Sequence, residues 1–131
     1  MHPADLRELE SRSSELVEAD WKPVRALLGI SAFGVNGFVA HHRGEVVIED
    51  HSEANTGFEE LYVVMSGEVT FSVERADGID ESFQMRAGQF IYVQPDRGRT
   101  ATAATDDASV LVVGAVAGKA FTVSRWERDR L

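Results

Sequence analysis

The sequence has no cysteine, which excludes disulfide bonds and thiolate metal sites. It has no apolar run long enough to span a membrane, and residues 1–8 have neither the basic flank nor the apolar core of a signal peptide. Basic residues are scarce, with 13 Lys and Arg against 22 Asp and Glu and a net charge of −9. Because phosphate binding needs clustered Lys and Arg, this composition argues against a nucleic-acid partner. We therefore expect a soluble, cytoplasmic protein with no membrane partner.

At 131 residues the chain is expected to form one domain with a core of its own, made of two segments. Residues 1–32 are predicted to be an N-terminal helical extension and residues 33–131 a β-barrel. Residues 4–20 carry a thin apolar stripe at roughly helical spacing, which favours a surface helix or a partly ordered arm. Asp20 is expected to cap a second short helix, with Pro23 in its first turn and Gly29 at its end. The extension would cover one end of the barrel; the alternative is a dimerisation arm.

From Phe33 onward the sequence consists of short β-type runs separated by turn residues, with no helical period among them. Strands at a spacing of about ten residues predict an antiparallel sandwich or barrel, and the lack of crossover helices excludes a parallel sheet. The nine predicted strands are Phe38–Ala40, Glu45–Glu49, Leu61–Val64, Val69–Val73, Ser82–Met85, Phe90–Val93, Thr100–Ala104, Val110–Val116 and Phe121–Val123. The tail after them, with Trp126 among charged residues, is expected to fold back over the barrel.

Residues 59–73 are the strongest of these strand signals. Two runs rich in β-branched and aromatic residues flank Ser66-Gly67, which predicts a β-hairpin with a two-residue turn. Neighbouring side chains of a strand point to opposite faces, so one of the adjacent acids Glu59 and Glu60 should face the interior. If Glu60 is the inward acid, it shares its face with Tyr62.

Two stretches carry a family pattern. Gly44, His51, Glu53, Glu60 and Gly67 follow one another as a glycine, a His-x-His pair, a glutamate and a second glycine do in the first motif of the cupin superfamily. The run from residue 88 to residue 100, a glycine, a short apolar strand and a proline-containing turn, is similar to the second motif. The resemblance implies an all-β fold, a cupin-type antiparallel jelly-roll β-barrel, and a homodimer. The family spacing to Gly67 selects Glu60 as the inward acid and leaves its neighbour to solvent.

The resemblance also implies a metal site, and this sequence carries only part of it. In cupins that use a metal, three histidines and the glutamate bind divalent iron, manganese, nickel or zinc. Here His51 takes the first histidine position and Glu53 the second, while an alternative alignment places Glu53 and Asn55 at the pair. The third histidine position falls on Arg99 or Thr100. Because a fixed cation repels a metal ion, we favour no metal cofactor.

If a metal does bind, its ligands are expected to be His51, Glu53 and Glu60. In the favoured interpretation Glu60 instead meets an arginine, Arg97 or Arg99, in an ion pair at the barrel mouth. The adjacent pair of histidines at residues 41 and 42 is interpreted as surface residues. Aromatic and acidic residues expected at the mouth, in some subset, are Phe58, Glu60, Tyr62, Phe71, Phe90 and Tyr92.

Three functions remain open at this point. The first is a small-molecule-binding barrel that lacks the three-histidine site and has an unnamed ligand, which an apolar cavity with a few converging polar groups would suit. The second is a metal-dependent enzyme of dioxygenase or isomerase type. A variant of it follows metal-free sugar-nucleotide epimerases of this barrel class, with His51 as base and Tyr62 or Tyr92 as acid. The third is a structural or regulatory dimerisation barrel without a ligand. The candidate ligand-binding residues are His51, Glu53, Glu60, Tyr62, Tyr92, Arg97 and Arg99.

Overall fold

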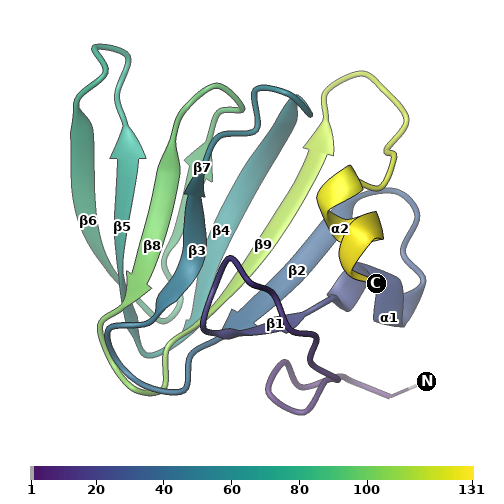
Figure 1. The fold of residues 1–131 in the computed structure, drawn as a ribbon, viewed down its shortest axis with the longest axis horizontal. Coiled ribbons are helices and arrows are strands. Elements are labelled where there is room, and N and C mark those ends of the chain that lie inside the picture. Colours follow the sequence, from purple (N-terminus) through teal and green to yellow (C-terminus); the bar gives the residue numbers. More distant parts are fainter. Residues whose placement is uncertain (1) are drawn as a thin grey trace.

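The computed structural model describes residues 2–131, which form two antiparallel β-sheets with two short helices at one flank (Figure 1). The first sheet has the order β1 (Asp20–Lys22), β2 (Gly34–Val39), β9 (Ser109–Val116), β4 (Phe58–Ser66) and β7 (Phe90–Val93). The second has the order β3 (Val46–His51), β8 (Arg99–Ala103), β5 (Glu68–Glu74) and β6 (Asp80–Arg86). The helices are α1 (Val24–Leu28) and α2 (Arg125–Arg130). The predicted all-β class with a jelly-roll arrangement is confirmed, since the chain passes repeatedly from one sheet to the other.

The hydrophobic core lies between the two sheets, where alternate side chains of each strand meet. Tyr62 and Val64 of β4 point inward and are almost fully buried, while Glu59 and Leu61 are exposed. From the opposite sheet, Phe71 of β5 meets the Tyr62 ring edge to face, with ring centroids 5.3 Å apart. The expected alternation along β4 is therefore confirmed, and it directs Glu60 into the interior.

The predicted hairpin at Ser66-Gly67 is wrong. β4 pairs with β7 and β9 in the first sheet, whereas β5 pairs with β6 and β8 in the second. Only Gly67 separates β4 from β5, which is one residue too few for a two-residue hairpin turn. With a φ of 64°, Gly67 turns the chain across to the other sheet, and a Cβ there would clash with the Thr105 hydroxyl. The glycine signals a corner between sheets.

The N-terminal segment is less helical than predicted. Residues 2–19 contain turns and an isolated bridge but no helix, and the segment is held by specific contacts instead. The Arg7 guanidinium donates to the Ser66 hydroxyl at 2.8 Å, and Leu6 fills the space above Gly37. Asp20 does not cap a helix, because it lies in β1, whose pairing with β2 takes up its backbone. α1 is present, with Pro23 at its N-cap and Gly29 at its C-cap in the left-handed conformation (φ 72°), as its glycine predicts.

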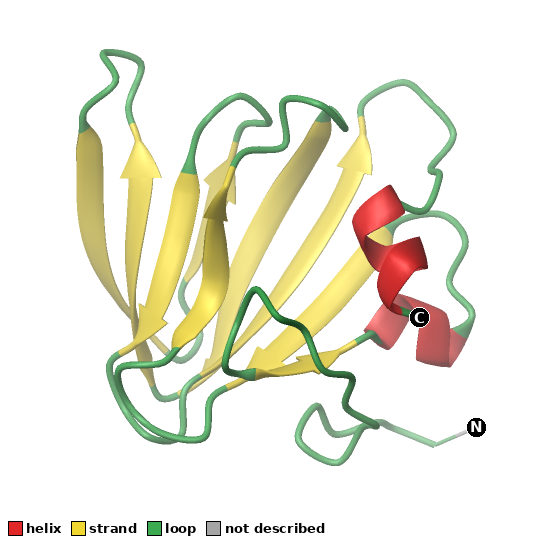
Figure 2. Cartoon of the chain, viewed as in Figure 1, coloured by secondary structure: helices red, strands yellow, loops and turns green. Residues whose placement is uncertain are grey.

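The C-terminal segment also differs in one respect. Residues 121–123, predicted as a strand, form a loop, and Phe121 packs on the Phe58 ring with centroids 5.7 Å apart. Ser124 then caps α2, its hydroxyl accepting a hydrogen bond from the Glu127 backbone N–H at 3.2 Å. Trp126 packs edge to face on Trp21 at 4.7 Å. The tail does fold back on the barrel, and Figure 2 draws α2 in red at the flank where the other short helix also lies.

Within residues 2–131, no helix is both long enough and apolar enough to cross a membrane.

Candidate functional site

A cavity of about 300 Å³ lies between the two sheets at the end that α2 covers. Its walls come from β2, β3, β4 and β9 and include Phe38, Ile48, Phe58 and Val112. Its cover comes from the two ends of the chain, with Leu16 and Val17 on one side and residues 121 and 124–127 on the other. The walls are mostly apolar, and the polar side chains gather at a few places. This is the composition of a typical small-molecule site.

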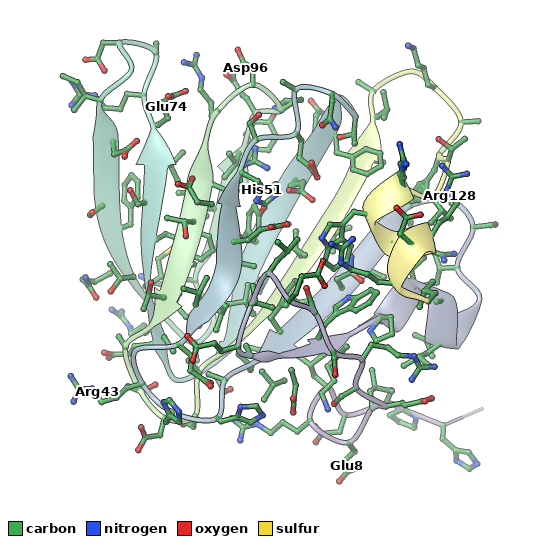
Figure 3. The ribbon with its side chains drawn as sticks, in the orientation of Figure 1. Glu8, Arg43, His51, Glu74, Asp96 and Arg128 are labelled. Carbon is green, nitrogen blue, oxygen red and sulfur yellow. The ribbon has the colours of Figure 1, made fainter. Side chains whose placement is uncertain are left out.

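Three of the predicted site residues converge on one end of this cavity. His51 ends β3, where Figure 3 labels it. Glu53 follows it in a short loop whose backbone is fixed by a bond from the Glu53 N–H to the Pro95 carbonyl at 2.7 Å. The Nε2 atom of His51 lies 4.0 Å from Glu53 Oε1 and 4.0 Å from Glu60 Oε1. One ligand atom from each of the three residues falls within 4.8 Å of the others.

The tautomer of His51 follows from its second nitrogen. Nδ1 lies 2.8 Å from the backbone carbonyl of Glu49, which can only accept, so Nδ1 is the donor. In the neutral ring Nε2 therefore presents its lone pair toward the two carboxylates. Three acceptors facing one another are stable only if a proton or a cation lies among them. The Nε2 lone pair and the two carboxyl groups can therefore share one proton or one cation.

Glu60 meets the arginine that the sequence predicts, and that arginine is Arg99. The Arg99 guanidinium donates to Glu60 Oε1 at 2.8 Å, and its side chain has no exposed surface. Its other donors are taken by the carbonyls of Gln94 at 2.7 Å and Arg97 at 3.0 Å. The Tyr62 hydroxyl also donates to Glu60 Oε1, at 2.6 Å. The predicted ion pair is confirmed, and the phenol belongs to the same hydrogen-bonded group.

A glycine on the neighbouring strand makes room for this group. Gly114 of β9 lies opposite Glu60 of β4 in the sheet. A Cβ at Gly114 would lie 3.1 Å from the Glu59 carbonyl oxygen and 3.1 Å from Glu60 Cγ. Any other residue at this position would press on the Glu60 side chain, so the glycine helps to set the direction of the carboxylate.

Burial and mutual repulsion shift the acid–base properties of the site. Burial, and then the negative charge of Glu60, raise the pKa of Glu53 to about 7. Burial also raises the pKa of Glu49, which lines the same cavity. The pKa of Tyr62 is raised well above its usual value by burial and by Glu60, so its hydroxyl stays protonated and remains a donor. The cavity therefore carries carboxyl groups that hold a proton more firmly than usual.

Other predicted residues lie away from the cavity. Tyr92 of β7 is half exposed on the outer face of the first sheet, where its hydroxyl donates to Glu59 Oε1 at 3.1 Å. Phe90 of the same strand is also on the outside, and Phe71 is part of the core. Arg97 contributes its backbone carbonyl to Arg99, while its own side chain lies 3.7 Å from Asp96. The structure thus brings together His51, Glu53, Glu60, Tyr62 and Arg99, and separates Tyr92 and the Arg97 side chain from them.

The histidine pair at residues 41 and 42 lies on the surface, as predicted. His41 is half exposed and lies 3.0 Å from Asp20 Oδ1 and 3.2 Å from Glu45 Oε2. Hydrogen bonds to Glu45 and the charge of Asp20 raise the pKa of His41. The pair joins a turn to β1 and has no contact with the cavity.

The tail with Trp126 was expected to fold over the barrel, but none of its residues was predicted to belong to the site. Glu127 of α2 lies 4% exposed, paired with Arg25 Nε at 2.8 Å, and its Oε1 has no hydrogen-bond partner within the described chain. Trp126 lines the cavity too, and its buried indole N–H also lacks an acceptor there. Arg130 ties the cover together by lying 4.8 Å above the Trp126 ring and binding Glu15 Oε1 at 2.5 Å. The position of Trp126 among charges was the only signal in the sequence.

The donor set fits a divalent metal in part. One imidazole and two carboxylates suit manganese, iron or zinc, and the three residues are close enough to share an ion. The buried guanidinium of Arg99 lies next to the same carboxylate, and it cannot act as a ligand. His51, Glu53 and Glu60 therefore form a candidate metal group with a fixed positive charge beside it.

Comparison with solved structures identifies proteins of similar fold. Oxalate decarboxylase of Bacillus subtilis, a protein with Mn(II) centres, matches with a TM-score of 0.64 and 15% identity over 93% of this chain. The chain spans about a third (32%) of the length of that protein. A cupin protein from Bacteroides fragilis matches with a TM-score of 0.56 and 21% identity, covering 89% of this chain and 92% of its own. No protein-family model and no curated protein matches the sequence.

Proposed function

Because the chain has a cupin fold, we propose that it binds a small organic molecule in the cavity between its sheets, without a metal. The observation that carries the proposal is the cavity of about 300 Å³, with apolar walls and His51, Glu53 and Glu60 converging at one end. Small-molecule sites are mostly apolar cavities in which a few polar groups orient the ligand. The two chain ends that cover the cavity would shield the ligand from water.

Arg99 supports binding without a metal. Its permanent charge lies 2.8 Å from Glu60 Oε1, and the same oxygen accepts a hydrogen bond from Tyr62. A metal bound to that oxygen would have to displace these donors and would be repelled by the guanidinium. The Arg99 side chain is fixed in this position, because it is fully buried and hydrogen-bonded to two carbonyls.

The second candidate is a metal-dependent enzyme of dioxygenase or isomerase type. It is favoured by one observation, the lone pair of His51 Nε2 aimed at Glu53 and Glu60 at 4.0 Å. If these three residues hold a divalent ion, it would supply Lewis-acid chemistry at this end of the cavity. His51 would be kept in the correct tautomer by its Nδ1 bond to the Glu49 carbonyl. The third candidate, a dimerisation barrel without a ligand, would leave the cavity without a role.

Elemental analysis and metal titration separate the first two candidates. The purified protein is expected to contain far less than one equivalent of manganese, iron, nickel or zinc, and added Mn(II) or Zn(II) should shift its melting temperature no more than it shifts that of His51→Ala. Near-stoichiometric metal that disappears in His51→Ala would contradict the proposal. His42→Ala, on the surface, is the matched control.

The fold similarity does not carry the oxalate chemistry across. Oxalate is a dianion, and the cavity here is lined by four carboxyl groups, those of Glu49, Glu53, Glu60 and Glu127. Oxalate would be repelled unless a metal bound first. The metal-free protein is therefore expected to show no binding of oxalate by calorimetry.

We also propose that the chain forms a homodimer, through the outer face of β4 and β7. Leu61, Phe90 and Tyr92 are 37%, 67% and 52% exposed and are neighbours on this face, and contiguous exposed apolar residues mark protein interaction sites. A second copy of the same face would cover them. Light scattering should give a dimer mass for the wild type and a monomer mass for Phe90→Lys.

A further inference from the structure

We infer that the ligand of the cavity is an organic cation, a protonated amine on a compact apolar or aromatic body. The inference rests on the proposed metal-free binding function and names the class of molecule that it takes. It starts from an imbalance among the charged side chains of the cavity, in which some carboxylates have a cationic partner and others have none.

Two of the cavity carboxylates are paired. Glu60 holds Arg99 at 2.8 Å, and Glu127 holds Arg25 at 2.8 Å. The other two are not: among residues 2–131, neither Glu49 nor Glu53 has an Arg or Lys within 4.0 Å. The His51 ring lies 4.0 Å from Glu53. Burial without a cationic partner disfavours the charged form of both groups, and an ammonium group beside them would stabilise that charged form.

The cations near the cavity are not available to an anionic ligand. Arg99 has no exposed side-chain surface and spends its donors on Glu60 and two backbone carbonyls. Arg25 is bound to Glu127 and to the carbonyl of Ile30 at 3.1 Å. Arg125, which also borders the cavity, is 85% exposed and lies 3.5 Å from Asp129. Arg99 and Arg25 are therefore already engaged by carboxylates and carbonyls, and Arg125 at the cavity border lies mostly in solvent.

The rest of the cavity suits the body of such a ligand. Phe38, Phe58 and Trp126 supply aromatic surface, which packs on apolar groups and attracts cations by their ring faces. The Glu127 Oε1 atom and the Trp126 indole N–H have no hydrogen-bond partner in the described chain, but both are covered by protein atoms and are not part of this contact surface.

The test uses three probes that share one aromatic ring and differ in charge: 2-phenylethylamine, 2-phenylethanol and phenylacetate. Each is titrated by calorimetry into metal-free wild-type protein in EDTA, and into Glu49→Gln and Glu53→Gln. Glu59→Gln is the matched control, because it removes the same charge from the outer face of the same strand as Glu60. Melting curves of all variants establish that each is folded.

The amine is expected to bind at least about tenfold more tightly than the alcohol, the ratio that roughly 1.4 kcal/mol of charge interaction gives. Phenylacetate should bind most weakly. Both Glu49→Gln and Glu53→Gln should reduce the preference for the amine, and Glu59→Gln should keep it. If the alcohol or phenylacetate binds as tightly as the amine, or if the preference survives in both cavity variants, the inference is wrong while binding in the cavity still stands. If none of the three probes binds, both the inference and the metal-free binding function are contradicted.

Discussion

Removing Arg99 should destabilise the protein more than removing any exposed arginine. In Arg99→Met the Glu60 carboxylate, 12% exposed, loses the guanidinium at 2.8 Å and keeps only the Tyr62 hydroxyl. The carbonyls of Gln94 and Arg97 lose their donors at the same time. Breaking a buried ion pair from one side typically costs about 3–5 kcal/mol, because the remaining charge stays buried without compensation. A domain of this size is stable by about 5–15 kcal/mol, so the variant should still fold.

The assay is urea unfolding at equilibrium, with Arg97→Met as the matched control two residues away. Arg97 is partly exposed and lies 3.7 Å from Asp96, so its removal should cost under about 1 kcal/mol. Adding Glu60→Gln to Arg99→Met should restore part of the lost stability, since it removes the stranded charge. A loss in Arg99→Met no larger than in Arg97→Met, or no recovery in the double variant, would refute the ion-pair account of the site.

Three further predictions concern the same group. Because the pKa of Glu53 is about 7 in the folded protein and 4.5 in the unfolded chain, its contribution to stability is present below about pH 4.5 and is lost as the pH rises to 7. The loss of stability between these pH values should reach at most about 3 kcal/mol in the wild type and be absent in Glu53→Gln. A wild-type pH profile identical to that of Glu53→Gln would contradict the raised pKa of Glu53. Tyr62→Phe removes the 2.6 Å bond to Glu60 and should lower the free energy of unfolding by about 1–2 kcal/mol. An unchanged free energy of unfolding would show that this bond does not stabilise the fold. Gly114→Ala should cost about 1–3 kcal/mol, because its Cβ would meet backbone and side chain at 3.1 Å; a neutral effect would mean that Glu60 has room to move.

The centre of the site was predictable from the sequence because it depends on local rules. Alternation along β4 directs Glu60 inward, and the family spacing distinguishes it from Glu59. The family's third histidine is replaced by an arginine near residue 99, so an ion pair between that arginine and the inward carboxylate was expected. Which of Arg97 and Arg99 fills that role depends on the path of the turn before β8, and the sequence left both open.

The rest depends on contacts between segments that are far apart in the chain. β7 reads Phe-Ile-Tyr-Val, with no alternation of polar and apolar residues, so nothing in it indicates that Tyr92 faces outward. The cover of the cavity joins Leu16 near one end of the chain to Trp126 near the other, and no local pattern predicts such a contact. The corner at Gly67 resembles a hairpin turn in sequence, and only the pairing of its flanking strands distinguishes the two.

The most direct test of the account is whether a ligand occupies the cavity between the sheets. Val112 lines the cavity from β9, and its neighbour Val113 faces the other side of the same strand. A panel of small aromatic molecules of each charge is titrated by calorimetry into metal-free wild type, Val112→Trp and Val113→Trp, each first shown by its melting curve to be folded. The account predicts that ligands of the wild type bind Val113→Trp equally well and fail to bind Val112→Trp, whose larger side chain fills the cavity. Equal binding to both variants, or no binding by the wild type, would contradict it.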